Sequence, residues 1–217
     1  MTAWADAALL ATAILNVAIL GSARLVRSVR RVALQGVALS LHALLAAGGV
    51  PEGRAILLAL GNGALKGVVF PYLLIRTIRA APARQEARPY VGFTLSVLFG
   101  AAFAVAGLLL ASRLPLPPAL RPPASDLAVP IAFASLFSGL FLIVARRHAV
   151  FQVLGYLMLE GGLYLFGTSL VRGAPFLVEM GVLLDAFVAV FIMGLALLHI
   201  GEDLDHHDTG RLAELKD

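Results

Sequence analysis

Seven long apolar stretches constrain this chain more than any other feature of its sequence. They cover about residues 3–22, 32–49, 55–75, 90–112, 128–145, 149–171 and 175–199. Each is close to the roughly 20 residues that a helix needs to cross a bilayer. Because 60% of the 217 residues are apolar and only 14% are charged, little sequence is left for a separate soluble domain. The expected fold class is an all-α integral membrane protein with seven transmembrane helices.

The positions of the basic residues predict which way these helices run. Twelve Lys and Arg residues follow the first, third and fifth stretches or lie in the C-terminal tail, four lie on the opposite side, and Lys66 lies inside a stretch. The positive-inside rule then places the N-terminus outside and the C-terminus inside. The arginines form short clusters between apolar stretches, the pair 146–147 among them, which indicates topology anchors and not a nucleic-acid surface. We expect a multi-pass protein of the bacterial inner (cytoplasmic) membrane.

The sequence indicates no cofactor or metal site and no active site of its own. It contains no cysteine, so disulfides, thiolate-ligated clusters and blue-copper centres are excluded. No hydrolytic triad, phosphate loop or nucleotide fingerprint is present. His206 and His207 lie in an acidic tail, but two adjacent histidines do not define a metal site. Any redox chemistry is therefore expected in a partner, and whether the chain belongs to an enzyme complex stays open at this point.

A weak internal repeat divides the chain. The run RRVALQG at 30–36, which enters the second stretch, resembles the run RRHAVFQ at 146–152, which enters the sixth. A shift of about 118 residues superimposes the first three stretches on the last three in a parallel orientation. We expect an N-terminal three-helix unit at 1–89, a connecting helix with a Pro-rich outer loop at 90–127, a second three-helix unit at 128–199 and a cytoplasmic tail at 200–217.

Four ionisable side chains are expected near the middle of the membrane. At a rise of about 1.5 Å per residue, each lies ~15–16 Å inside its stretch, which is about half of a hydrocarbon core of roughly 30 Å. They are His42, Lys66, Glu160 and Asp185. The repeat pairs His42 with Glu160 and Lys66 with Asp185. Glu179 lies about one turn inside the outer end of the last stretch.

Such a row of groups is typical of a proton path. Ionisable residues within a membrane usually face the bundle interior or a water-filled cavity. Burial there raises the pKa of a carboxyl group and lowers the pKa of an amine, so that both can exchange protons near neutral pH. The residues 61–63 (GNG), Pro71 and the pair 161–162 (GG) allow a kink, a π-bulge or close helix packing. An alternative interpretation is that Lys66 forms a structural ion pair with Asp185 or Glu160 that only fixes the register of the helices.

Several runs resemble known families. The run 145–160 resembles the entry of the second helix of the K-type subunit of respiratory complex I, and the last three stretches correspond to that whole subunit. The runs 156–160 (YLMLE), 178–185 (VEMGVLLD) and 208–216 (DTGRLAELK) are similar to component E of hydrogenase-4 type membrane complexes. This likeness is strong over the C-terminal third and weak over the N-terminal half. Glu160 lies three residues after the glutamate of the K-type subunit, whose position Leu157 occupies here.

The resemblance implies a non-catalytic membrane-arm subunit of a complex-I-like, redox-driven proton or sodium pump. It implies antiporter-like membrane subunits and a peripheral, hydrogenase-like redox arm as partners. Glu160 and Asp185 would lie on the proton path, and Lys66, His42 and Glu179 would extend it. Two other functions remain open from the sequence: a stand-alone permease for a small solute or ion, and an anchor whose charges are simply paired.

Overall fold

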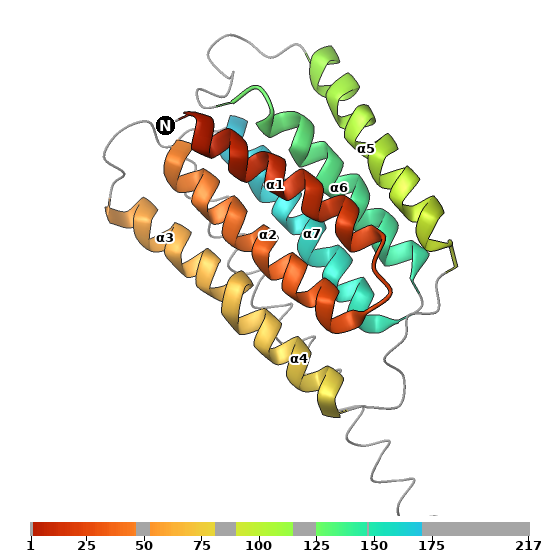
Figure 1. The fold of residues 1–217 in the computed structure, drawn as a ribbon. Helices are drawn as coiled ribbons and strands as arrows, with labels where there is room; N and C mark the ends of the chain where they lie inside the picture. The colour runs from red at the N-terminus through yellow and green to blue at the C-terminus, as the bar shows by residue number, and fades with distance from the viewer. Residues whose placement is uncertain (1, 47–52, 81–89, 115–124, 147, 171–217) are drawn as a thin grey trace, which may run out of the picture.

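The computed structural model describes residues 2–46, 53–80, 90–114, 125–146 and 148–170, and its elements are all helical (Figure 1). The elements are α1 (Thr2–Leu20), α2 (Leu25–Ala46), α3 (Gly53–Ala64), the π-helix η1 (Leu65–Val69), α4 (Phe70–Ala80), α5 (Phe93–Arg113), α6 (Ala128–Ala145) and α7 (Ala149–Leu170). Within these residues, α1, α2, α5, α6 and α7 are long and apolar enough to cross a membrane. The expected class of helical membrane protein is therefore confirmed.

Four helices form the centre of the described structure. α1 packs on α2 and α6, and α7 packs on α2 and α6, so that these four helices close a ring. α5 lies on the side of α6, and α3, η1 and α4 follow one another along the side of α2 (Figure 1). The first and second predicted three-helix units thus touch through α1 with α6 and through α2 with α7.

Small residues allow α6 and α7 to pack closely. A Cβ atom added at Gly139 of α6 would lie 2.5 Å from the carbonyl oxygen of Gly155 in α7, and one added at Gly162 of α7 would lie 2.8 Å from the carbonyl oxygen of Ala132. Backbones that approach this closely need glycine, as is common where helices associate within a bilayer. The glycine that follows Glu160 by two positions therefore serves helix packing, one of the two roles that the sequence left open.

The third predicted stretch is helical from Gly53 to Ala80 but is not a regular α-helix. Its middle turn, Leu65–Val69, is a π-helix in which the N–H of Phe70 donates to the carbonyl oxygen of Leu65. Pro71 follows directly, and because proline has no N–H, a carbonyl group about one turn earlier loses its helical donor. The π-bulge that the glycines and Pro71 allow is thus found at this position.

Two expectations about helix boundaries are corrected or left open. α2 begins at Leu25, seven residues before the predicted start of the second stretch, because Arg24, Arg27 and Arg30 recur every three residues on an exposed face while Leu25 and Val29 are buried. A search for continuous apolar stretches misses this amphipathic start of the helix. The seventh predicted stretch, 175–199, and the Pro-rich run 115–123 lie outside the described residues.

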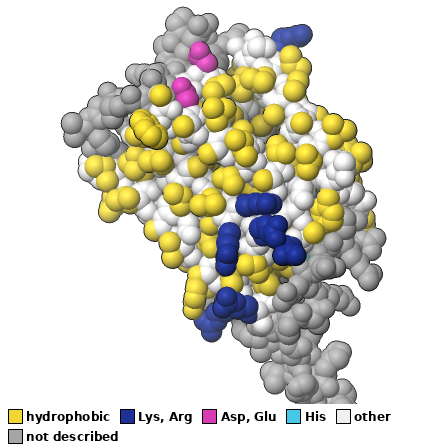
Figure 2. Space-filling model, in the orientation of Figure 1, with side chains coloured by type: hydrophobic (Ala, Val, Ile, Leu, Met, Phe, Trp, Pro, Cys, Tyr) yellow, Lys and Arg dark blue, Asp and Glu magenta, His cyan; other side chains and the backbone are white. Residues whose placement is uncertain are grey.

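Charged and apolar side chains are separated on the surface. Figure 2 shows most of the Lys and Arg side chains of the visible face gathered in its lower half, with hydrophobic side chains spread over the remainder. The end where α2 begins and α4 finishes carries five exposed arginines, namely Arg24, Arg27, Arg30, Arg76 and Arg79. α5 is apolar and largely exposed. These surfaces suit a bilayer or a neighbouring membrane subunit.

We predict that Gly139→Ala lowers the free energy of unfolding by about 1–3 kcal/mol, because the added methyl group overpacks the α6–α7 contact against backbone atoms. The measurement is the thermal-unfolding midpoint of the full chain in detergent. Gly61→Ala is the matched control, since a Cβ there meets no atom within 4 Å, and it should be neutral or stabilising by up to about 1 kcal/mol. Equal midpoints for the two variants would contradict the close approach of α6 and α7.

Candidate functional site: a buried lysine and glutamate pair

Lys66 of η1 and Glu160 of α7 form an ion pair inside the bundle, between Nζ and Oε2. Lys66 is 6% exposed and Glu160 is 3% exposed. By the helical rise, Lys66 lies ~20 Å along the segment that starts at Gly53 and Glu160 lies ~16 Å along α7, each about midway. The pair therefore joins the middle of the first predicted unit to the middle of the second.

A glycine of α2 makes room for Lys66. A Cβ added at Gly36 would lie 2.6 Å from the Cβ of Lys66, and one added at Gly67 would lie 2.7 Å from a side-chain methyl group of Val37. The π-helical turn thus packs directly on the backbone of α2. The extra residue of this turn rotates the chain locally, and it lies where Lys66 reaches α7.

Two further side chains connect the same helices. Tyr164 lies one turn after Glu160 on α7, and its ring centroid is 5.8 Å from the ammonium nitrogen of Lys66, a distance at which a cation and an aromatic face attract each other. The side chain of Asn62, one turn before Lys66, lies near the Tyr164 hydroxyl group. The ion pair is therefore flanked by Asn62 of α3 and Tyr164 of α7.

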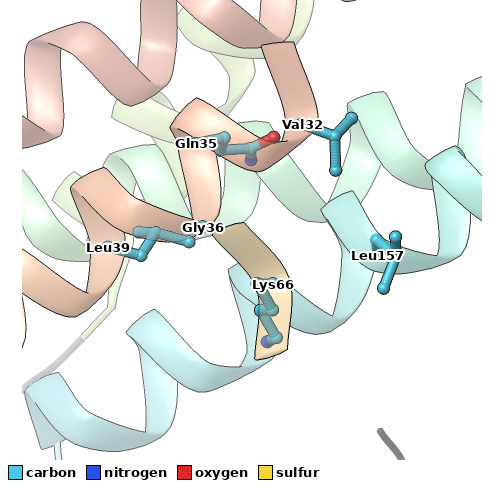
Figure 3. A pocket seen from close by; sticks show the side chains of 7 residues that line it. Val32, Gln35, Gly36, Leu39, Lys66 and Leu157 are labelled. Atoms are coloured by element: carbon cyan, nitrogen blue, oxygen red, sulfur yellow. The ribbon is translucent and has the colours of Figure 1, made fainter. Parts of the chain in front are cut away.

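A small cavity adjoins the ion pair. It has room for about one water molecule, and only two of its lining residues, Gln35 and Lys66, carry polar side chains. Figure 3 shows most of the lining: α2 contributes one wall, α7 contributes Leu157, and η1 contributes Lys66. The lining residues are Val32, Gln35, Gly36, Leu39, Lys66, Leu157 and Gly161. A small, mostly apolar space thus lies beside the charged pair.

Three uncharged polar side chains, beginning with Gln35 of the cavity lining, are joined by hydrogen bonds. The sequence pattern did not predict this connection. Gln35 Nε2 donates to Asn16 Oδ1 at 2.9 Å, and Asn16 Nδ2 donates to Ser135 Oγ at 2.8 Å. All three side chains are at least 98% buried. In the sequence, Gln35 stands out only as the glutamine of the repeated run at 30–36; its counterpart in the run at 146–152 is Gln152, which is exposed. The signal in the sequence was the two amides within apolar stretches, which cost energy in a membrane unless they are paired.

His42 does not join Lys66 and Glu160. Its Nδ1 atom is 3.2 Å from the carbonyl oxygen of Ala5 in α1, and the side chain is 4% exposed. Leu9 and Leu39, both buried, belong to an apolar cluster that α1, α2, α6 and α7 share. Among the described residues, His42 thus contacts α1, and its connection to Lys66 stays a prediction. Because α2 runs from Leu25 to Ala46, His42 lies four residues before the end of α2 and not near its middle, where a count from residue 32 places it.

Asp185 and Glu179 lie outside the described residues, and so does the predicted pairing of Lys66 with Asp185. His206 and His207 lie outside them as well. Within the ranges that the structure describes, no group of three or more metal-ligating side chains occurs. The part of the predicted proton path that the structure brings together is thus Lys66 with Glu160.

Arg146 has a structural role in addition to the topology anchor that the sequence indicates. Its guanidinium group is buried and donates to the carbonyl oxygen of Leu20 at 2.6 Å, while Arg31 donates to the carbonyl oxygen of Ala18. Carbonyl groups at a helix C-terminus have no helical donor and carry partial negative charge. The two arginines therefore cap α1. The Arg146 guanidinium also lies 4.4 Å from the ring centroid of Phe93.

The fold and the site define a helical, multi-pass membrane protein with a charged pair in its interior. Neither a family model nor a solved structure matches the chain. It is 36% identical over 194 residues to the uncharacterized protein Rv0085 of Mycobacterium tuberculosis, with 87% of this chain and 85% of that protein covered. The chain therefore belongs to the family of Rv0085.

The chain is also distantly homologous to hydrogenase-4 component E. It is 28% identical over 153 residues to component E of Escherichia coli K12, with 70% of this chain and 68% of that protein covered. Component E of Shigella flexneri matches with the same identity and coverage. The expected likeness to component E is thus supported, whereas the likeness to the K-type subunit of complex I has no counterpart in these matches.

We predict that Lys66→Met lowers the free energy of unfolding by about 3–5 kcal/mol, because it leaves the Glu160 carboxylate buried without its counter-charge. The double variant Lys66→Met with Glu160→Leu should recover most of this loss, since a buried pair can be replaced by apolar side chains at little cost. Thermal unfolding of the full chain in detergent provides the measurement. Arg113→Met, at an exposed position, is the control. A Lys66→Met variant as stable as this control would contradict the ion pair.

Proposed function

We propose that the chain is a non-catalytic membrane-arm subunit of a complex-I-like, redox-driven ion pump of the hydrogenase-4 type. In this proposal it contributes Glu160, with Lys66 as its partner, to a lateral proton path through the membrane. Support comes from the homology to hydrogenase-4 component E and from the buried Lys66–Glu160 pair. Asp185, Glu179 and His42 stay proposed members of the path.

The buried ion pair is the observation that carries the proposal. A proton that moves from Lys66 Nζ to the Glu160 carboxylate converts the charged pair into a neutral amine and a carboxylic acid. In a medium of low dielectric constant the cost of keeping two desolvated charges is comparable to their attraction. The two forms can therefore lie close in energy, and a charge arriving nearby can shift one into the other. A pair on the lipid-exposed surface could not act in this way.

The geometry of the helices supports a lateral path rather than a pore through this chain alone. Lys66 and Glu160 belong to different predicted units, at 1–89 and 128–199, and meet about midway along their helices. The cavity beside them has room for about one water molecule only. A proton that reaches Glu160 would therefore enter or leave through neighbouring subunits. Antiporter-like membrane subunits are the proposed neighbours, and a peripheral hydrogenase-like arm is the proposed source of redox energy.

The proposed topology has seven spans, the N-terminus outside and the C-terminus inside the bacterial inner membrane. The exposed arginines at the end where α2 begins support this direction, because basic residues are enriched on the cytoplasmic side. The helix from Gly53 to Ala80 would be the third span, with its π-turn near the middle. The connecting unit at 90–127 and the tail at 200–217 complete the proposed organisation.

Two other functions make different demands on the Lys66–Glu160 pair. A stand-alone permease would transport without partners, so transport by the purified chain in liposomes would favour it. A membrane anchor needs the pair only for packing. Because Lys66 contacts Glu160, the discriminating double variant is Lys66→Met with Glu160→Leu: an anchor would tolerate it with full pumping by the complex.

We predict that Glu160→Gln leaves assembly of the complex intact and abolishes most of its redox-driven proton translocation. The amide keeps an oxygen that accepts a hydrogen bond from Lys66 but cannot exchange a proton at neutral pH. Assembly is measured by co-purification of the other subunits, and translocation by acidification of proteoliposomes during turnover.

Asp126→Asn is the matched control for this variant, because it removes an exposed carboxylate just before α6 without touching the ion pair. Its translocation should equal that of the wild type. Full translocation by an assembled Glu160→Gln complex would remove Glu160 from the path and leave the anchor as the better function.

A further inference from the structure

The surroundings of Lys66 change when the Glu160 carboxylate binds a proton. A proton that reaches the ion pair leaves Glu160 as a carboxylic acid and Lys66 as an ammonium group with all three N–H bonds. The pair then carries one net positive charge instead of none. Lys66 is 6% exposed, and a charge inside a membrane bundle is costly unless another group stabilises it. The protonated pair therefore needs a second partner for the ammonium group.

The ring of Tyr164 is in the position of this second partner. Its centroid is 5.8 Å from the Lys66 ammonium nitrogen, within the ~6 Å over which a cation and an aromatic face attract each other. In the part of the chain that the structure describes, the ammonium group has two electrostatic partners, the Glu160 carboxylate and this ring. The ring is therefore the partner that remains once Glu160 is neutral.

The register of the helices holds the ring beside Lys66. Glu160 and Tyr164 are four residues apart on α7, and residues at this spacing lie on one face of a helix. On the facing segment, Lys66 meets Glu160, and Asn62 lies near the Tyr164 hydroxyl group. The two segments thus meet in antiparallel register, with the Tyr164 hydroxyl toward Asn62 and the ring toward Lys66.

An aromatic face attracts a cation without exchanging a proton. The ring has a quadrupole whose negative side is its face, and a tyrosine side chain is uncharged near neutral pH. The same face repels a carboxylate, so its net effect on an intact ion pair is smaller than its effect on an ammonium group alone. Tyr164 therefore stabilises the protonated pair more than it stabilises the ion pair.

We propose that Tyr164 is a positioning residue that stabilises the Lys66 ammonium group beside Glu160 while the Glu160 side chain is protonated. It acts through the face of its ring and neither binds nor releases the proton. The proton enters and leaves through Glu160, and when it leaves, the carboxylate forms the ion pair with Lys66 again. This role rests on the proposed function, in which Glu160 exchanges protons, and adds to it a residue that does not titrate.

Substitutions that weaken the ring face but keep the size of the ring test this role in the assembled complex. Tyr164 is replaced by phenylalanine and by phenylalanines that carry one, two or three fluorine atoms, because each fluorine makes the face less negative. Redox-driven proton translocation is measured in proteoliposomes. We expect Tyr164→Phe to translocate at about the wild-type rate, and the rate to fall stepwise with each fluorine to about a tenth.

Tyr72→Leu is the matched control, because Tyr72 is a tyrosine of α4 that is 63% exposed. Its translocation should equal that of the wild type. Equal rates across the fluorinated series would overturn the role of the ring face, even with a slow Tyr164→Leu variant, because packing alone would then explain that loss. A wild-type rate for Tyr164→Leu would overturn it as well.

Thermal unfolding of the full chain in detergent separates this role from the proposed function. Glu160→Gln leaves Lys66 beside a neutral side chain, so the ring should contribute more to stability in this background than in the wild type. We expect the change from phenylalanine to trifluorinated phenylalanine at position 164 to lower the unfolding midpoint more in Glu160→Gln. The difference between the two shifts isolates the link to the charged pair.

The two experiments can fail separately. Equal shifts of the midpoint in the two backgrounds would overturn the role of Tyr164 and leave the proposed function standing. Unequal shifts together with full translocation by an assembled Glu160→Gln complex would remove the proposed function, and with it the part of Tyr164 in the proton step.

Discussion

The ion pair between Lys66 and Glu160 is the interaction on which the arrangement of this bundle depends. A charge placed halfway through a bilayer is tolerated only with a partner or water, so each of these two helical segments must bring its charged face to the other. η1 therefore lies against α2 and α7, with Gly36 of α2 leaving the space that the lysine stem occupies. The pair also ties together the two predicted units, which in the described part of the chain meet as well through Arg146, the Gln35–Asn16–Ser135 chain and apolar side chains.

The local irregularity of the third helical segment serves this contact. Leu65–Val69 forms a π-turn, and Pro71 removes a backbone donor just beyond it. A regular α-helix through these residues would place Lys66 at a different angle around the helix axis. The segment thus gives up regular hydrogen bonding where its charged residue must reach a partner. The ring of Tyr164, 5.8 Å from the Lys66 ammonium nitrogen, adds a second contact between the same two segments.

The sequence predicted the helices, the depth of Lys66 and Glu160, and Glu160 as one of two possible partners of Lys66, but it did not predict the position of His42. Helix positions follow from apolar length because the bilayer fixes the length of a span, and α6 and α7 begin where they were expected. Counting residues placed Lys66 and Glu160 about midway along their helical segments, as the structure has them, but it misplaced His42 because α2 begins earlier than its apolar stretch. Rotation and neighbours are set by packing, as at Gly36, where the backbone of α2 makes room for Lys66. The Gln35–Asn16–Ser135 chain escaped notice because uncharged polar residues stand out less than charges do.

Protonation of Glu160 during turnover is the central claim, and infrared difference spectroscopy of the assembled complex tests it most directly. The spectrum of the resting complex is subtracted from that of the complex supplied with its reductant, for the wild type and for Glu160→Gln. A carboxylic-acid stretching band that changes during turnover and is missing in the variant is the predicted result. Identical carboxyl regions in the two difference spectra, with the variant fully assembled, would contradict a role for Glu160 in moving protons.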